Sequence, residues 1–143
     1  GNPKNITSVE DLSQSGLKVA LGDTNGTAVG KESIKILNKT GNLAAVKSNV
    51  VVYAPTVNQL MTYVTSGQVD AAIVTEDIAT TGDAQDKIDV ILIPNDQNSI
   101  ATIGVGLTVF TKNKDLAMQF EDYITSPKGL LIWEKHGFKP VTE

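Results

Sequence analysis

The length and composition of the sequence are those of one ordinary globular domain. The chain has 143 residues, of which 41% are hydrophobic and 20% charged, so it can bury a core and is unlike a disordered segment. A net charge of -4 argues against a nucleic-acid partner, and the absence of cysteine removes disulfides, thiolate metal sites and cysteine nucleophiles. The longest apolar stretch, residues 100–110, contains threonine and glycine and is shorter than the ~20 residues of a membrane-spanning helix.

Predicted strands and helices alternate in the first half of the chain. Residues 7–10 (TSVE) form a capping box, which predicts a short helix. Residues 17–21 alternate apolar and polar side chains as a strand does, and a helix is predicted from about Ala28 to its stop at Gly41. The β-branched run at residues 50–53 predicts a strand that is buried on both faces.

The middle of the chain continues this alternation. Residues 56–59 (TVNQ) form a second capping box, and they open a helix whose apolar stripe includes Leu60 and whose stop is Gly67. Further buried strands are predicted at residues 71–74 and 88–93. This order of elements predicts the α/β class, with a mainly parallel sheet flanked by helices.

The last part of the chain is predicted to be extended and then helical. After Pro94 it runs extended as far as Phe110, and Asn113 then caps a helix. Ser126 and Pro127 start another helix, with the proline at its first position. The C-terminal third therefore adds helices to the fold.

One segment, residues 25–33, resembles a phosphate-binding P-loop because it follows a strand and opens a helix. The P-loop motif requires a glycine where Asn25 stands. It also requires serine or threonine directly after Lys31, where Glu32 stands. Both requirements fail, so the sequence does not predict nucleotide hydrolysis.

The strongest chemical feature is a pair of helix starts that each follow a predicted strand. Backbone N–H groups at residues 27–30 and 56–58 have no partner inside their own helices. Because both starts lie at the carboxyl ends of strands in one sheet, they can converge on a single anion. The alternative stays open that both are simply well-capped helices, since any parallel α/β sheet has such starts.

Other polar residues are weaker candidates for chemistry. Glu76 and Asp77 follow a predicted strand and could act as an acid–base pair, but they also suit the first turn of a short helix that runs through Thr80. His136, the single histidine, suits a helix C-terminus, and Trp133 suits a core. We therefore expect no catalytic residue, no metal site and no cofactor.

Several segments closely resemble the periplasmic molybdate-binding proteins of ABC transporters. They are GLKVALGD at 16–23, TAVGK at 27–31, NQLMTYVTSGQVDAAIV at 58–74, SPKG at 126–129 and EKHGFKP at 134–140, with NPKNI at 2–6. The resemblance covers the whole chain but only the later part of a family member. It implies one lobe of a type II periplasmic-binding-protein fold. Residues 1–103 would form the second lobe, and residues 104–143 a helical return segment that packs on a first lobe preceding Asn2.

The resemblance also implies a function. Such proteins lie outside the cytoplasm, bind a tetrahedral oxyanion such as molybdate or tungstate, and deliver it to the permease of an ABC transporter, so they meet the membrane only indirectly. The family's second-lobe contacts fall on Val29, Val57 and Thr75, and the helix-start argument adds Thr27. Val29 and Val57 would act through backbone N–H groups. At Thr75 some family members have tyrosine, whose hydroxyl reaches farther than that of threonine.

An alternative function is the effector-binding lobe of a transcriptional regulator, which can share this architecture. A helix-turn-helix and a basic surface, which a regulator would carry, are not visible in the sequence. The chain also begins abruptly at Gly1 without a signal peptide, so we expect it to come from a larger protein. Alone it should bind an oxyanion weakly, and it should rearrange or form a homodimer to cover the apolar residues Leu116, Phe120, Leu130 and Trp133.

Overall fold

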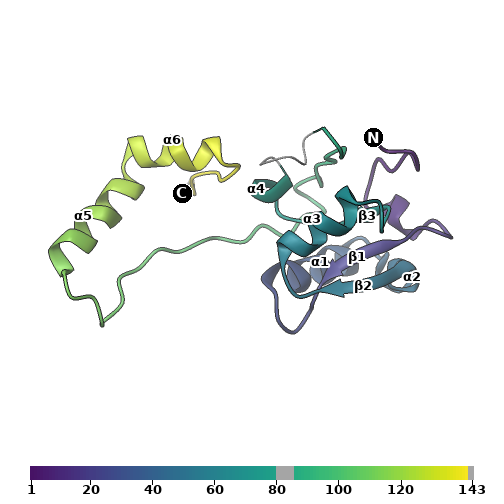
Figure 1. Ribbon diagram of the computed structural model, residues 1–143, viewed down its shortest axis with the longest axis horizontal. Coiled ribbons are helices and arrows are strands. Elements are labelled where there is room, and N and C mark those ends of the chain that lie inside the picture. Colours follow the sequence, from purple (N-terminus) through teal and green to yellow (C-terminus); the bar gives the residue numbers. More distant parts are fainter. Residues whose placement is uncertain (80–85, 142–143) are drawn as a thin grey trace. The chain divides into compact units, whose positions relative to one another are not determined.

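The computed structural model describes residues 1–79 and 86–141, in two units that comprise Gly1–Ile100 (unit 1) and Ala101–Glu143 (unit 2) (Figure 1). Unit 1 carries the sheet, and unit 2 carries a pair of helices. Within these described residues, every helix is too short or too polar to cross a membrane.

Unit 1 is built on a parallel sheet in the order β2-β1-β3, flanked by helices, which confirms the predicted fold class. Its strands are β1 (Val19–Gly22), β2 (Val50–Ala54) and β3 (Ala71–Ala72). Its helices, among the described residues, are η1 (Glu10–Ser13), α1 (Ala28–Lys39), α2 (Leu43–Asn49), α3 (Val57–Thr65) and α4 (Glu76–Ala79). Of these, α2 was not predicted. The predicted end of the helix at Thr80 lies outside the described residues.

The central strand β1 supplies two cores, because its successive side chains point to opposite faces of the sheet. Val19 and Leu21 are completely buried against η1, α1 and α2, whereas Ala20 is completely buried on the side of α3. Leu37 of α1 and Leu60 of α3 are the fully buried leucines of the two helical layers. Helices therefore cover both faces of β1, and the predicted apolar stripe at Leu60 is confirmed.

The stops of α1 and α3 are as predicted. Gly41 (φ 73°) and Gly67 (φ 71°) follow these helices in the left-handed conformation, which glycine adopts without steric cost. The edge strand β2 differs from its prediction. Val51 and Tyr53 are 58% and 46% exposed, so burial on both faces is wrong. As an edge strand, β2 is covered on one face, where Val52 packs into the core, and an apolar run alone does not reveal this position.

Residues 88–93, which were predicted as a strand, form neither strand nor helix. Val90, Ile91 and Leu92 are 46%, 40% and 66% exposed. Of this segment, only Ile93 packs partly against the core that lies on the side of η1, α1 and α2. The prediction is wrong because a strand needs a paired neighbour, and no strand within residues 1–79 or 86–141 pairs with this segment.

The first helix of the chain has a different cap from the predicted one. The carboxylate of Asp11, not that of Glu10, accepts hydrogen bonds from the N–H groups of Thr7 (2.8 Å) and Ser8 (3.1 Å). The hydroxyl of Ser8 in turn accepts from the N–H of Asp11 (3.4 Å). The capping box is therefore shifted by one residue and opens a short 3-10 helix. The hydrogen bonds that the carboxylate accepts, first from the backbone N–H of Thr7 and then from its hydroxyl, lower the pKa of Asp11 from 3.8 to about 2.

Unit 2 consists of α5 (Lys114–Thr125) and α6 (Pro127–Lys135), as predicted. Asn113 caps α5 through the N–H of Leu116 (3.1 Å), and Ser126 caps α6 through that of Gly129 (3.2 Å). The indole N–H of Trp133 donates to the carbonyl of Ile124 (3.1 Å), which ties α6 to the end of α5.

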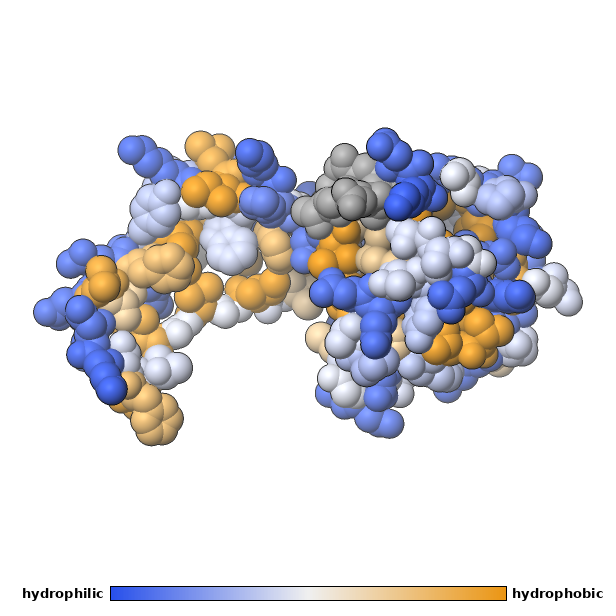
Figure 2. Space-filling model, viewed as in Figure 1, coloured by the Kyte–Doolittle hydropathy of each residue, from blue (hydrophilic) through white to orange (hydrophobic). Residues whose placement is uncertain are grey.

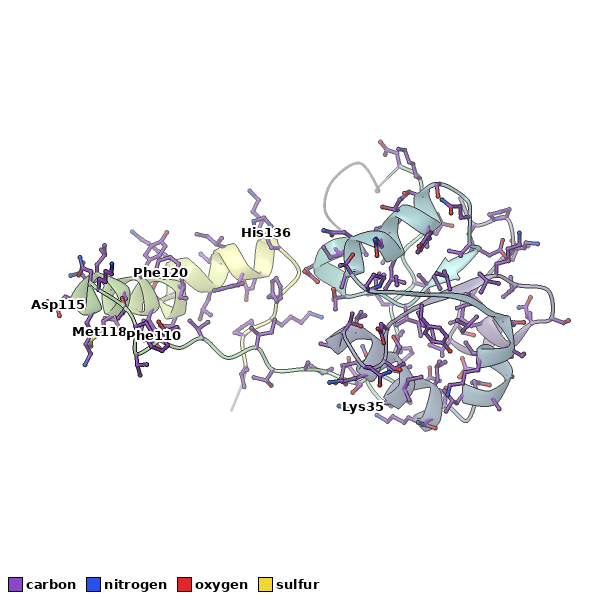
Figure 3. All side chains as sticks on the ribbon, turned by 60° about the horizontal axis from the view of Figure 1, so that its bottom comes forward. Lys35, Phe110, Asp115, Met118, Phe120 and His136 are labelled. Carbon is purple, nitrogen blue, oxygen red and sulfur yellow. The ribbon has the colours of Figure 1, made fainter. Side chains whose placement is uncertain are left out.

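Apolar side chains lie on the outside of unit 2, as the surface hydropathy shows (Figure 2). Phe110, Met118 and Phe120 are 88%, 46% and 62% exposed (Figure 3). Leu116 and Leu131 are 60% and 66% exposed. Within the described part of unit 2, these helices therefore leave most of their apolar surface uncovered.

Candidate functional site

Two helix starts lie at one edge of the sheet in unit 1. The last residues of β1 and β2, Gly22 and Ala54, are partners in register, and the N–H of Asp23 donates to the carbonyl of Ala54 (2.8 Å). α1 begins at Ala28 after the loop that follows β1, and α3 begins at Val57, separated from the end of β2 by two residues. Because parallel strands end at the same edge, both helix N-termini face the region beyond that edge.

The start of α1 is held by Thr27. Its backbone is extended (φ -124°, ψ 145°), and its hydroxyl donates to the carbonyl of Asp23 (2.8 Å) and accepts from the N–H of Gly30 (3.0 Å). The N–H of Thr27 also donates to the carbonyl of Asp23 (2.9 Å). In this turn, the N–H groups of Ala28 and Val29 have no acceptor among the described residues. A contact from Thr27 to an anion would require breaking its bonds to Asp23.

The start of α3 repeats this arrangement. Thr56 is extended (φ -142°, ψ 154°), and its hydroxyl accepts from the N–H of Gln59 (3.2 Å). The threonine half of the second predicted capping box is therefore present. Within residues 1–79 and 86–141, no acceptor faces the N–H groups of Val57 and Asn58. Each helix thus presents two free N–H groups at the same edge of the sheet, and a half-buried Val57 side chain packs behind them.

Two glycines let the helix start approach the strand end, a role that the sequence analysis missed. A Cβ atom at Gly30 would lie 2.5 Å from the carbonyl oxygens of both Gly22 and Asp23. A Cβ atom at Gly22 would lie 2.7 Å from the hydroxyl oxygen of Thr27. The signal in the sequence is a glycine at the last position of a strand and another in the first turn of the next helix.

Thr75 follows β3 and precedes α4. Because β3 is parallel to β1, the chain leaves both strands in the same direction, which places Thr75 toward the same end of the sheet as the helix starts. The residue is exposed, and its carbonyl accepts from the N–H of Ala79 (3.3 Å). Glu76 and Asp77 lie in the first turn of α4, in agreement with their helix-start interpretation.

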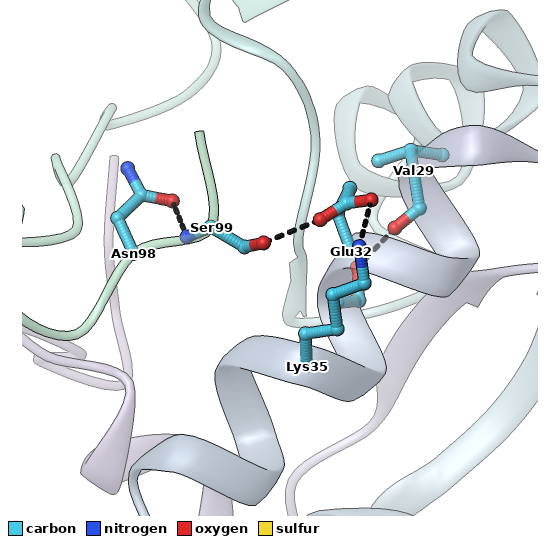
Figure 4. A network of polar contacts seen from close by, with 6 residues as sticks. Val29, Glu32, Lys35, Asn98 and Ser99 are labelled. Carbon is cyan, nitrogen blue, oxygen red and sulfur yellow. Dashed lines mark hydrogen bonds and ion pairs between the residues drawn. The ribbon is translucent and has the colours of Figure 1, made fainter. Parts of the chain in front are cut away.

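The only acidic side chain of α1 is already paired. Glu32 accepts a hydrogen bond from the ammonium group of Lys35 (2.8 Å) and another from the hydroxyl of Ser99 (Figure 4). These contacts, with Lys35 the larger, hold the pKa of Glu32 below its ordinary value. Lys35 therefore neutralises the negative charge of Glu32. The first turn of α1 carries no acidic side chain that would repel an anion. Among the described residues, no group of three acidic or histidine side chains could hold a metal ion.

Residues 1–139 match a family model described as bacterial extracellular solute-binding protein. The match covers nearly the whole chain, and the chain belongs to this family.

Two relatives and one solved structure extend this result. The chain is 32% identical over 135 residues to a Haemophilus influenzae protein named "Putative binding protein", a match that covers 94% of this chain and 54% of the relative. It is 30% identical over 140 residues to the Bacillus subtilis "Putative ABC transporter substrate-binding lipoprotein YvgL", covering 95% of this chain and 52% of the relative. The chain therefore spans about half the length of both relatives.

The solved structure is the "substrate binding domain of putative molybdenum ABC transporter from Clostridium difficile". Its TM-score is 0.77 at 26% sequence identity, and the match covers 97% of this chain and 60% of that structure. The fold of the present chain is thus that of a solute-binding-protein lobe.

Proposed function

We propose that the chain is the second lobe of an extracytoplasmic binding protein that delivers a tetrahedral oxyanion, molybdate or tungstate, to the permease of an ABC transporter. The family model and the lipoprotein relative support a binding protein outside the cytoplasm. The molybdenum transporter named for the solved structure supports the oxyanion. These relatives also favour this function over the effector-binding lobe of a regulator.

The observation that carries the proposal is the set of free N–H groups at the starts of α1 and α3. Uncharged donors that point away from the protein suit an anion whose oxygens can only accept hydrogen bonds. The aligned peptide dipoles add a partial positive charge of about half a unit at each helix start. Molybdate and tungstate are fully ionised near neutral pH, so every oxygen can accept from such a donor. Val29 and Val57 are the predicted contacts on this surface.

The same geometry limits what this chain binds by itself. A helix start contributes about 0.3–1 kcal/mol to the binding of an anion when exposed, rising to about 2 kcal/mol when partly buried. Two starts therefore supply roughly 1–4 kcal/mol, which corresponds to a Kd that is millimolar or weaker. A buried dianion needs donors on all sides, so we propose that a first lobe supplies the other wall and that residues 104–143 pack on it.

Proline substitution provides a selective test of the backbone donors. Val57 is the first residue of α3, a position that accepts proline, and Thr56 already has the extended backbone that a residue before proline adopts. Val57→Pro therefore removes one N–H without disturbing the helix, whereas Val57→Ala keeps it. In the two-lobe protein, we expect Val57→Pro to weaken molybdate binding about tenfold or more, as for loss of a hydrogen bond to a charged group.

The matched variant Val57→Ala should bind molybdate nearly as well as the unmodified protein in the same calorimetric titration. Ala28→Pro offers the equivalent deletion at the start of α1, because Thr27 is also extended. Thr56→Pro is a poor probe, since the φ of -142° at Thr56 is outside the range of proline and the variant would disturb folding. If Val57→Ala abolishes binding while Val57→Pro does not, the site is not made of backbone donors.

A further inference from the structure

The loop that enters α1 contains the single Asn-Gly pair of the sequence, Asn25 and Gly26. Both residues are exposed, and the loop turns at residues 24–26. The side-chain amide of Asn25 makes no hydrogen bond within the described residues, and the N–H of Gly26 has no acceptor there. Glycine offers no side chain to hinder an approach to its backbone nitrogen, and asparagine is among the thermally labile residues.

We infer that Asn25 is a site of spontaneous deamidation, a covalent modification that needs only water. The backbone nitrogen of Gly26 loses its proton and attacks the side-chain amide carbon of Asn25, forming a new C–N bond. The bond from that carbon to Nδ2 breaks, and this nitrogen takes up through water the proton that Gly26 lost and leaves as ammonia, which gives a five-membered succinimide. Water then opens the ring on either side, to aspartate or to isoaspartate. Nothing is oxidised or reduced, and the chain gains one negative charge.

Other asparagines of the chain provide internal comparisons. Asn98 also precedes a small residue, Ser99, but its side-chain oxygen accepts from the N–H of Ser99 (2.8 Å) and its amide donates to the carbonyl of Ile93 (3.4 Å). Asn49 is buried, and its amide donates to two carbonyls. The side-chain amides of Asn98 and Asn49 are thus fixed by carbonyl acceptors, and the residue after each is larger than glycine, whereas the amide of Asn25 makes no such bond among the described residues and precedes a glycine.

The modification changes the loop that holds the helix start. The carbonyl of Asp23 accepts from both the N–H and the hydroxyl of Thr27, which closes the chain around Asn25. Isoaspartate adds one atom to the main chain inside this closed turn. The longer main chain changes the spacing of Asp23 and Thr27, so we expect the two hydrogen bonds between them to break. Aspartate keeps the spacing but adds a second carboxylate two residues from Asp23. Either product adds a negative charge to the loop that leads into α1.

The test is to incubate the chain in mildly alkaline buffer and follow its peptides by mass spectrometry, with enzymatic methyl labelling of isoaspartate. We expect the mass gain and the label in the peptide that contains Asn25, well before any appear at Asn98 or Asn49. Gly26→Ala is the control, because Gly26 has no left-handed φ and its Cβ would meet only the carboxylate of Asp23, at 3.3 Å. This variant should be modified many-fold more slowly.

Two results would overturn the inference. One is an unmodified Asn25 after incubation in which Asn98 has reacted, and the other is an equal rate in Gly26→Ala. A further effect rests on the proposed function. Asn25→Asp should weaken molybdate binding by the two-lobe protein about three- to tenfold, and this loss should shrink at high salt. Since modification is read from mass alone, a failed binding effect counts against the proposed anion site and not against the modification site.

Discussion

Replacement of Gly30 by alanine tests how closely α1 approaches the end of β1. In an ordinary helix, alanine is more favourable than glycine by about 1 kcal/mol. Here the added Cβ would lie 2.5 Å from two carbonyl oxygens, those of Gly22 and Asp23, and backbone atoms cannot turn aside as a side chain can. Overpacking of this kind costs about 1–3 kcal/mol, occasionally more. With two backbone contacts we take the upper part of that range, so the net loss is about 1–2 kcal/mol.

The assay is thermal and urea unfolding of the chain followed by circular dichroism. A loss of about 1–2 kcal/mol lowers Tm by roughly 4–16 °C in a domain of the size of unit 1, Gly1–Ile100. Gly26→Ala is the matched control, since its Cβ meets only the carboxylate of Asp23, and it should change Tm little. A Gly30→Ala chain as stable as the unmodified chain, or more stable, would refute the close approach and with it the described geometry of the helix start.

Two further predictions concern unit 1. Asn49 is 8% exposed, and its side-chain amide donates to the carbonyls of Leu12 (2.8 Å) and Gln14 (2.7 Å). Asn49→Ala should therefore lower the free energy of unfolding by about 1–3 kcal/mol, measured by urea titration. An unchanged midpoint of unfolding would contradict the role of this bridge. The pKa of Asp11 is lowered from 3.8 to about 2, so its contribution to stability is complete above 3.8 and is lost as the pH falls through about 2. Asp11→Asn should therefore show a flatter loss of stability in this pH window than the unmodified chain, and equal slopes would contradict the cap.

Much of the fold could be predicted because its signals are local. Thr27 and Thr56 each precede a helix and cap it. Gly41 and Gly67 end helices in the left-handed conformation, which glycine adopts without the steric cost that other residues meet. Such residues act on atoms within four positions of themselves. Their effect is therefore readable from the sequence before any tertiary contact is known.

The wrong predictions concern segments whose structure depends on contacts with residues far away in the sequence. The runs at 50–53 and 88–93 are both mainly apolar, yet the first is an edge strand with exposed Val51 and the second pairs with no strand of the described residues. At the candidate site, the sequence indicated the helix starts but not which N–H groups stay free. The N–H of Gly30 is taken by the hydroxyl of Thr27, a competition that only the folded turn reveals.

The proposed oxyanion site has one wall that is formed by the starts of α1 and α3 together. A titration of ¹⁵N-labelled chain with molybdate, followed amide by amide by NMR, tests this arrangement. We expect the largest shifts at the amides of Ala28, Val29, Val57 and Asn58, with a common Kd that is millimolar or weaker. Shifts confined to other residues would contradict the site, and submicromolar binding by the isolated monomer would contradict the claim that this chain supplies only one wall of it.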